Sequence, residues 1–100
     1  MDQANQPVPK KQINIKVKDE QLVGKYSNMM QVAHTKEEFI LDFMNIVPPQ
    51  GVLASRIILS PGHLKRIIKA LQDNLQKYEY AFGEIEESGP PAKIDLNTNG

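Results

Sequence analysis

The chain lacks several features that would narrow its chemistry. Its 100 residues include no cysteine and no tryptophan, and only 6% of them are aromatic. The absence of cysteine excludes a disulfide scaffold and thiol chemistry. No apolar run is long enough to span a bilayer, and the N-terminus has neither the basic nor the apolar region of a signal peptide. We therefore expect a cytoplasmic protein with no membrane partner.

An excess of one charge is also missing. The 12 Lys and Arg residues balance the 12 Asp and Glu residues, so the formal net charge is +0. A protein that binds nucleic acid usually carries a basic excess, so any such attraction here must be local. With 40% hydrophobic residues, the chain fits a single small domain.

Catalytic and cofactor motifs are missing as well. His34 and His63 are the only imidazoles, and neither has a second histidine one helical turn away, as a helical metal site would need. Ser55 and Ser60 do not lie in a Gly-x-Ser-x-Gly elbow, and the single glycines form no phosphate-binding loop. We therefore expect no metal, no cofactor and no enzymatic activity.

A long helix is predicted directly after Ser60. Ser60 is a preferred N-cap, Pro61 suits the first helical position, and Gly83 follows the last periodic residue. One apolar stripe, with residues alternately four and three apart, consists of Leu64, Ile68, Leu71, Leu75, Tyr78 and Phe82, with Ile67 beside it. This is also the spacing of a helix pair, but it covers fewer than three heptads. We therefore expect the helix to lie on the sheet of its own domain.

Extended segments precede the helix. Strands are expected at residues 12–18, 25–34, 38–47 and 52–59. The first alternates apolar and polar residues and carries lysines on its polar face, as an edge strand does. The last two are apolar on both sides, which is typical of strands covered on both faces. Between the first two, residues 19–24 break the alternation, and residues 19–23 could instead form a short helical turn.

The predicted fold class is α+β, with a four-stranded antiparallel meander and one long C-terminal helix packed on one face. The polar residues 1–11 and 84–100 are expected to be a disordered lead and tail around a domain of residues 12–83. Because one helix covers one face of a sheet, the other face needs another cover, and a second copy is the simplest supplier. We expect a homodimer that buries the face carrying Ile40, Met44, Val52, Ala54 and Ile58.

Two charged residues, Asp42 and Arg56, interrupt otherwise apolar strands. A charge on a covered face is tolerated mainly when it is paired. If the turn after the third strand places Val47 opposite Gly51, the antiparallel register places Asp42 across from Arg56. We predict a structural ion pair between them, the alternative being that each reaches solvent separately at an open face.

Basic residues crowd the start of the predicted helix, where the positive end of the macrodipole favours acidic residues. They are His63, Lys65, Arg66 and Lys69. Together with Ser60 and the free N–H groups of the first turn, they form a candidate site for a phosphate, a carboxylate or an acidic segment. A solvated helix face would account for the same residues.

Several short runs resemble a small prokaryotic domain-of-unknown-function family, DUF3467. The runs are Val23-Gly24-Lys25-Tyr26-Ser27-Asn28, Val32-Ala33-His34-Thr35, Glu38-Phe39-Ile40-Leu41-Asp42-Phe43, Ser55-Arg56-Ile57-Ile58-Leu59-Ser60-Pro61, and Tyr78-Glu79 with Phe82-Gly83. The resemblance covers residues 12–83 and implies no activity. More loosely, the expected four strands and long helix are similar to the core of SecB-type export chaperones, at the level of the fold alone.

These observations indicate an interaction protein. We expect a non-enzymatic, homo-oligomeric module that binds a protein or peptide partner, with a chaperone-like holder as one form of it. The alternative is a nucleic-acid or phosphate-ligand binder that uses the basic start of the helix. The neutral total charge favours the first function over the second.

Overall fold

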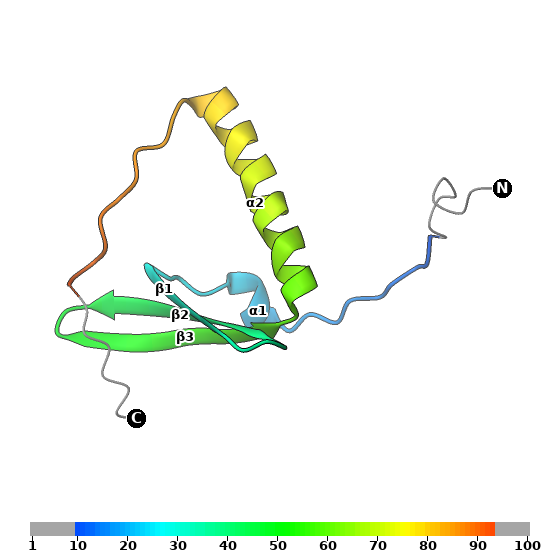
Figure 1. Cartoon of the computed structure of the whole chain (residues 1–100), viewed down its shortest axis with the longest axis horizontal. Coiled ribbons are helices and arrows are strands. Elements are labelled where there is room, and N and C mark those ends of the chain that lie inside the picture. Colours follow the sequence, from blue (N-terminus) through cyan, green and yellow to red (C-terminus); the bar gives the residue numbers. More distant parts are fainter. Residues whose placement is uncertain (1–9, 94–100) are drawn as a thin grey trace.

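The computed structural model describes residues 10–93, and Figure 1 shows their arrangement. The elements in chain order are α1 (Asp19–Val23), β1 (Met29–His34), β2 (Phe39–Val47), β3 (Gln50–Leu59) and α2 (Pro61–Phe82). The strands form one 3-stranded antiparallel sheet in the order β1-β2-β3. The predicted α+β class is confirmed, but the sheet within residues 10–93 has three strands rather than four. Most of the predicted disordered lead and the end of the predicted tail lie outside the described residues.

The strand expected at residues 12–18 does not form. These residues have no regular structure, and Ile13 and Ile15 are 77% and 81% exposed. The helical turn left open for residues 19–23 is present as α1, where the Lys18 N–H donates to Gln21 Oε1 at 2.8 Å. Gly24 follows with a φ of 79°, which turns the chain before β1. The alternation of residues 12–18 would give a strand an apolar face, but the chain before α1 leads away from the sheet (Figure 1).

Strand β1 begins at Met29 rather than at the predicted Lys25, because side chains take over the pairing just before it. The Asn28 side-chain amide donates to Ile46 O and its carbonyl accepts from Ile46 N–H, both at 2.9 Å. The Ser27 hydroxyl donates to Met44 O at 3.0 Å. The Asn28 side chain thus makes the two hydrogen bonds that a paired backbone residue would make, and these bonds join the start of β1 to the end of β2.

The hairpin between β2 and β3 differs from the predicted one by one residue. Val47 lies opposite Gln50 instead of Gly51, across the turn Pro48-Pro49, whose peptide bond is cis. A β-bulge then places Met44 opposite Leu53 and Phe43 opposite Ser55, so that Ala54 is the extra residue. The Lys25 ammonium group donates to Ala54 O at 3.0 Å. The bulge restores the register beyond it, and Asp42 lies opposite Arg56.

The bulge also changes which residues share a face. Val52 lies opposite Asn45, on the face of Phe43 rather than that of Met44, and Ala54 is the bulged residue. The prediction that Val52 shares a face with Ile40, Met44 and Ile58 is therefore wrong, and Ala54 has no partner across the strands. The sequence pattern of β3 gives no sign of the bulge, because the strand is apolar on both sides.

The core of the single chain is small. Among the described residues, Leu41 and Leu59 are the buried hydrophobic ones, at 9% and 7% exposure. Both lie on the same face of the sheet, since Leu59 is opposite Phe39 and Leu41 is two residues further along β2. Leu64 and Ile67, in the first two turns of α2, are half-buried. The core therefore lies beside the start of α2.

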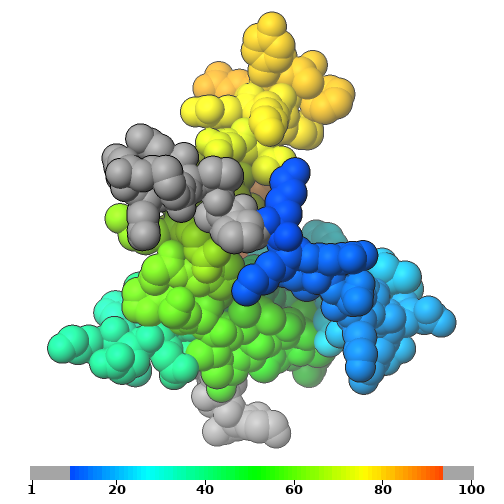
Figure 2. Space-filling model, turned by 90° about the vertical axis from the view of Figure 1, so that its right-hand side faces the viewer, coloured from blue at the N-terminus to red at the C-terminus, as the bar shows by residue number. Residues whose placement is uncertain are grey.

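Helix α2 does not lie on the sheet. From Ile68 to its end, every residue except the half-buried Glu79 is exposed, and most of the helix stands clear of the strands (Figures 1 and 2). A single extended residue, Ser60, connects β3 to α2, and the helix leaves the sheet at an angle (Figure 1). The predicted packing on one face is therefore wrong beyond the first two turns. Residues 84–93 have no regular structure and run back toward the sheet (Figure 1).

Candidate interaction surfaces

One face of the sheet combines exposed apolar side chains with the two charges. We name it the Asp42 face, and by register its members are Met29, Gln31, Ala33, Ile40, Asp42, Met44, Ile46, Gly51, Leu53, Arg56 and Ile58. Leu53 and Ile58 are exposed, while Ile40 and Met44 are half-buried. All three strands contribute to this face, and apolar side chains from each of them surround the two charges.

Asp42 and Arg56 form a two-point ion pair across β2 and β3. Arg56 Nε lies 2.7 Å from Asp42 Oδ1 and Arg56 Nη2 lies 2.9 Å from Asp42 Oδ2. The Arg56 side chain is 57% exposed and that of Asp42 is 19% exposed. The hydrogen bond from Arg56, helped by its charge and opposed by burial, lowers the pKa of Asp42. The same bond raises the pKa of Arg56. The pair is thus formed in the single chain, with water still reaching the arginine.

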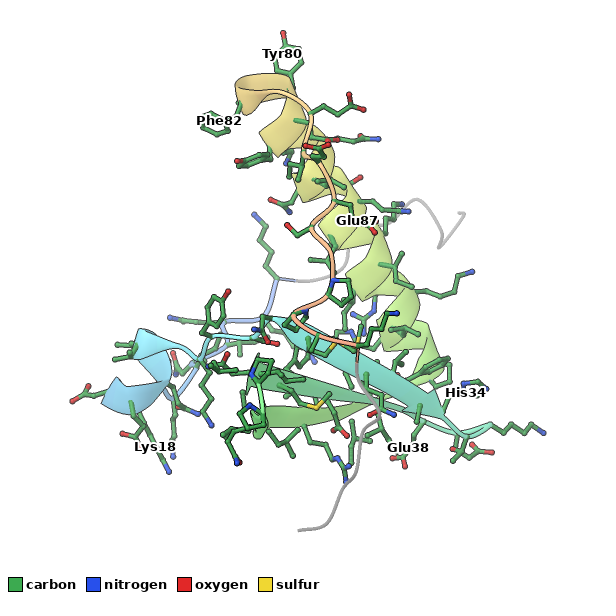
Figure 3. All side chains as sticks on the ribbon, turned by 90° about the vertical axis from the view of Figure 1, so that its left-hand side faces the viewer. Lys18, His34, Glu38, Tyr80, Phe82 and Glu87 are labelled. Carbon is green, nitrogen blue, oxygen red and sulfur yellow. The ribbon has the colours of Figure 1, made fainter. Side chains whose placement is uncertain are left out.

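The second surface is the α2 stripe, formed by Leu64, Ile68, Leu71, Leu75, Tyr78 and Phe82. Only Leu64 among them is half-buried, and Leu71, near the middle, is 65% exposed. The rings of Tyr78 and Phe82 lie 5.0 Å apart and form an aromatic cluster near the end of the helix. Figure 3 shows Phe82 and the neighbouring Tyr80 extending from this end into open space. The stripe expected to be covered by the sheet is therefore left exposed among residues 10–93.

The candidate anion site is an exposed helix start. Ser60 Oγ accepts a hydrogen bond from the His63 N–H at 3.2 Å, which is the predicted N-cap. Pro61 has no N–H, and the N–H of His63 is bonded to the cap. Neither residue therefore offers a free backbone donor in the first turn. The side chains of Lys65, Arg66 and Lys69 lie in exposed positions. The structure therefore supports the capping role of Ser60 and leaves the basic side chains on an exposed part of the helix.

The turn between β1 and β2 has a structural explanation. Thr35 Oγ1 accepts hydrogen bonds from the N–H groups of Glu37 and Glu38, both at 3.2 Å. The His34 ring lies 5.3 Å from that of Phe39, its neighbour across the strands. Figure 3 shows His34 and Glu38 at this end of the sheet. Within residues 10–93, no three His, Asp or Glu side chains come together as metal ligands.

No helix in the described part of the chain is long and apolar enough to cross a membrane. A family model described as "Protein of unknown function (DUF3467)" matches residues 1–87. The chain belongs to the DUF3467 family. No curated protein and no solved structure matches it. The looser likeness to SecB-type chaperones therefore has no support.

Several of the short segments that resemble the DUF3467 family contain residues whose side chains make hydrogen bonds that hold this fold together. Ser27 and Asn28 fasten β1 to β2, Asp42 pairs with Arg56, and Ser60 caps α2. The role of Asn28 was missed by sequence reasoning, which assigned residues 25–34 to one strand. A signal was available, because Ser and Asn side chains next to an apolar run often bond to the backbone where a strand begins.

Proposed function

We propose that this DUF3467 protein is a non-enzymatic interaction module that works as a homo-oligomer and binds a protein or peptide partner. One observation carries the proposal: among the described residues two hydrophobic side chains are buried, Leu41 and Leu59, while large apolar side chains are exposed on both the sheet and α2. Exposed apolar patches of this kind mark interaction sites. Association would supply the buried surface that one chain lacks.

The Asp42 face is the surface we assign to the partner. Its exposed Leu53 and Ile58 flank an ion pair whose arginine remains accessible to water. Among the described residues, β3 pairs on one side only, with β2, so it is an edge strand. An extended segment with alternating apolar residues fits such an edge and face, and its backbone carbonyls could accept from Arg56. This is how a chaperone-like holder would bind unfolded chain.

Light scattering tests the oligomer. The wild-type protein at micromolar concentration is expected to have the mass of a dimer or a larger oligomer. A monomer mass at all concentrations up to millimolar would contradict the proposal.

A peptide titration tests the partner surface. The probe is a synthetic peptide with the sequence of residues 12–18, whose apolar and polar residues alternate. It is expected to shift the NMR signals of Ile40, Met44, Leu53 and Ile58, and the variant Ile58→Lys should weaken this binding. A scrambled peptide of the same composition is the control. Equal binding of both peptides, or shifts confined to other surfaces, would contradict the assignment.

The basic start of α2 gives no comparable support for anion binding. Its cap is already formed between Ser60 and His63, and its basic side chains are exposed. An exposed helix face carrying Lys and Arg requires no ligand to explain it.

A further inference from the structure

The α2 stripe has the same spacing in both directions. Positions 64 and 82, 68 and 78, and 71 and 75 are each equidistant from Asp73. When two such helices run antiparallel with a twofold axis beside Asp73, every stripe residue meets another stripe residue. Leu64 of one copy then faces Phe82 of the second, Ile68 faces Tyr78, and Leu71 faces Leu75. Each outer layer joins an aliphatic with an aromatic side chain, and the central layers join leucines.

The charges beside the stripe are complementary in the same arrangement. In heptad terms Leu64, Leu71 and Tyr78 occupy one core position, and the residues after them, Lys65, Gln72 and Glu79, occupy the same flanking position. Antiparallel helices bring like flanking positions together. Lys65 would therefore face Glu79 of the second copy at both ends, and Gln72 would face its own counterpart. Lys65, Gln72 and Glu79 lie beside the apolar core of the pair, where their side chains reach water and can rotate to contact each other.

A parallel pair would lose this complementarity. It brings the flanking position of Lys65, Gln72 and Glu79 against the opposite one, occupied by Ile67, Asn74 and Ala81. None of those three side chains is charged, so neither Lys65 nor Glu79 would gain an ionic partner. Flanking charges set the orientation of paired helices, and here they favour the antiparallel one.

We infer that two copies of this protein join through α2, with the two helices antiparallel and the α2 stripe of each covered by that of the other. This inference rests on the homo-oligomer proposed above and names its interface. A helix of 22 residues spans about 33 Å, so the sheets lie at opposite ends of the pair. Phe82 of the second copy would then lie beside Leu64 and enlarge the small core at the start of α2. The Asp42 face takes no part and stays available for a partner.

Charge exchange tests the pairing of Lys65 with Glu79. Lys65→Glu creates two repulsive contacts per dimer, so the dissociation constant is expected to rise roughly tenfold. The double variant Lys65→Glu with Glu79→Lys should return it to within about threefold of the wild-type value. Each exchange places the charge that the macrodipole prefers at its end of α2, so the helix itself is not weakened. Glu79→Lys alone also loses the bond that Glu79 accepts from the Ile85 N–H, which makes Lys65→Glu the cleaner single variant.

Disulfide trapping tests the orientation, and the chain offers a clean background because it contains no cysteine. In the antiparallel pair, Gln72 lies near its counterpart, while the two Phe82 residues are about 27 Å apart along the axis. Gln72→Cys should therefore form a disulfide-linked dimer on mild oxidation, and Phe82→Cys should not. A parallel pair would give the reverse result, since Phe82 would then face its counterpart across the core.

The outcomes separate the inference from the function on which it rests. The masses of the wild type and of reduced Gln72→Cys are measured first, and a monomer mass for both would overturn the oligomer and the interface together. A dimer in which Phe82→Cys is linked, or in which neither variant is linked, overturns the antiparallel α2 pair and leaves the oligomer standing. A dimer linked by Gln72→Cys alone, with rescue by the double charge exchange, supports the inference.

Discussion

At the scale of single residues, the bond between Asp42 and Arg56 links stability to pH. Because the pKa of Asp42 is lowered in the folded chain, the bond contributes stability above the unfolded value of about 4. That contribution is lost as pH falls through the folded value. The variant Asp42→Asn is therefore expected to be less stable than wild type at pH 7, and the difference should shrink below pH 4. Urea unfolding of both proteins between pH 7 and pH 2 measures this, with Asp73→Asn on α2 as control. A difference that stays constant across that range would contradict the prediction.

A second prediction at the scale of single residues concerns the contribution of the Asn28 side chain to stability. It exchanges two hydrogen bonds with the backbone of Ile46, and it is partly buried. Asn28→Ala leaves both backbone groups without that partner and should lower the free energy of unfolding by about 1–3 kcal/mol. The matched control is Asn74→Ala, which removes one exposed bond to Ala70 O within α2 and should change stability by less than about 0.5 kcal/mol. Equal losses in the two variants would show that Asn28 does not fasten β1 to β2.

The contact between Asp42 and Arg56 shows how much of the strand pairing can be predicted from the sequence. Two charges within apolar strands indicated a pair, and the structure brings them together. The turn assumed for that pairing was wrong by one residue, and the bulge at Ala54 compensates for it. The two charges indicated their own pairing because opposite charges directly across two strands favour each other. A bulge in a strand apolar on both sides changes nothing in the pattern and could not be foreseen.

At the scale of elements, the ends of the long helix were predicted better than the way in which the elements pack together. Helix α2 runs over Pro61–Phe82 as Ser60, Pro61 and Gly83 indicated, because caps depend on neighbours in the chain. The segment 12–18 has the alternation of a strand, yet a strand also needs a neighbour, and that is set by residues far along the chain. The same limit applies to α2, whose stripe predicts burial without naming what covers it.

The exposed segment before α1 gives an element-scale prediction. Ile15 is 81% exposed, so Ile15→Ser should change the free energy of unfolding by less than about 0.5 kcal/mol. Leu41→Ala, in the centre of β2, removes a buried side chain and should cost about 2–5 kcal/mol. Denaturant unfolding of both variants at one protein concentration makes the comparison. A large loss for Ile15→Ser would mean that this segment pairs with a second copy as the missing strand.

At the scale of the whole molecule, stability should depend on protein concentration. If copies associate through the α2 stripe, association favours the folded chain by mass action, and the midpoint of thermal unfolding rises as the protein is concentrated. Leu71→Glu places a charge in the centre of the stripe, where a second copy would cover it without a partner. This variant is expected to be a folded monomer whose midpoint is lower than that of wild type and independent of concentration. The control is Tyr80→Glu, because Tyr80 lies on α2 outside the stripe and is 96% exposed. It should retain the dimer mass and the concentration dependence.

Calorimetry would measure the unfolding midpoint and light scattering the mass, each from 5 to 500 µM, roughly a hundredfold range. A wild-type midpoint that does not move with concentration would rule out α2 as an interface that stabilises the fold.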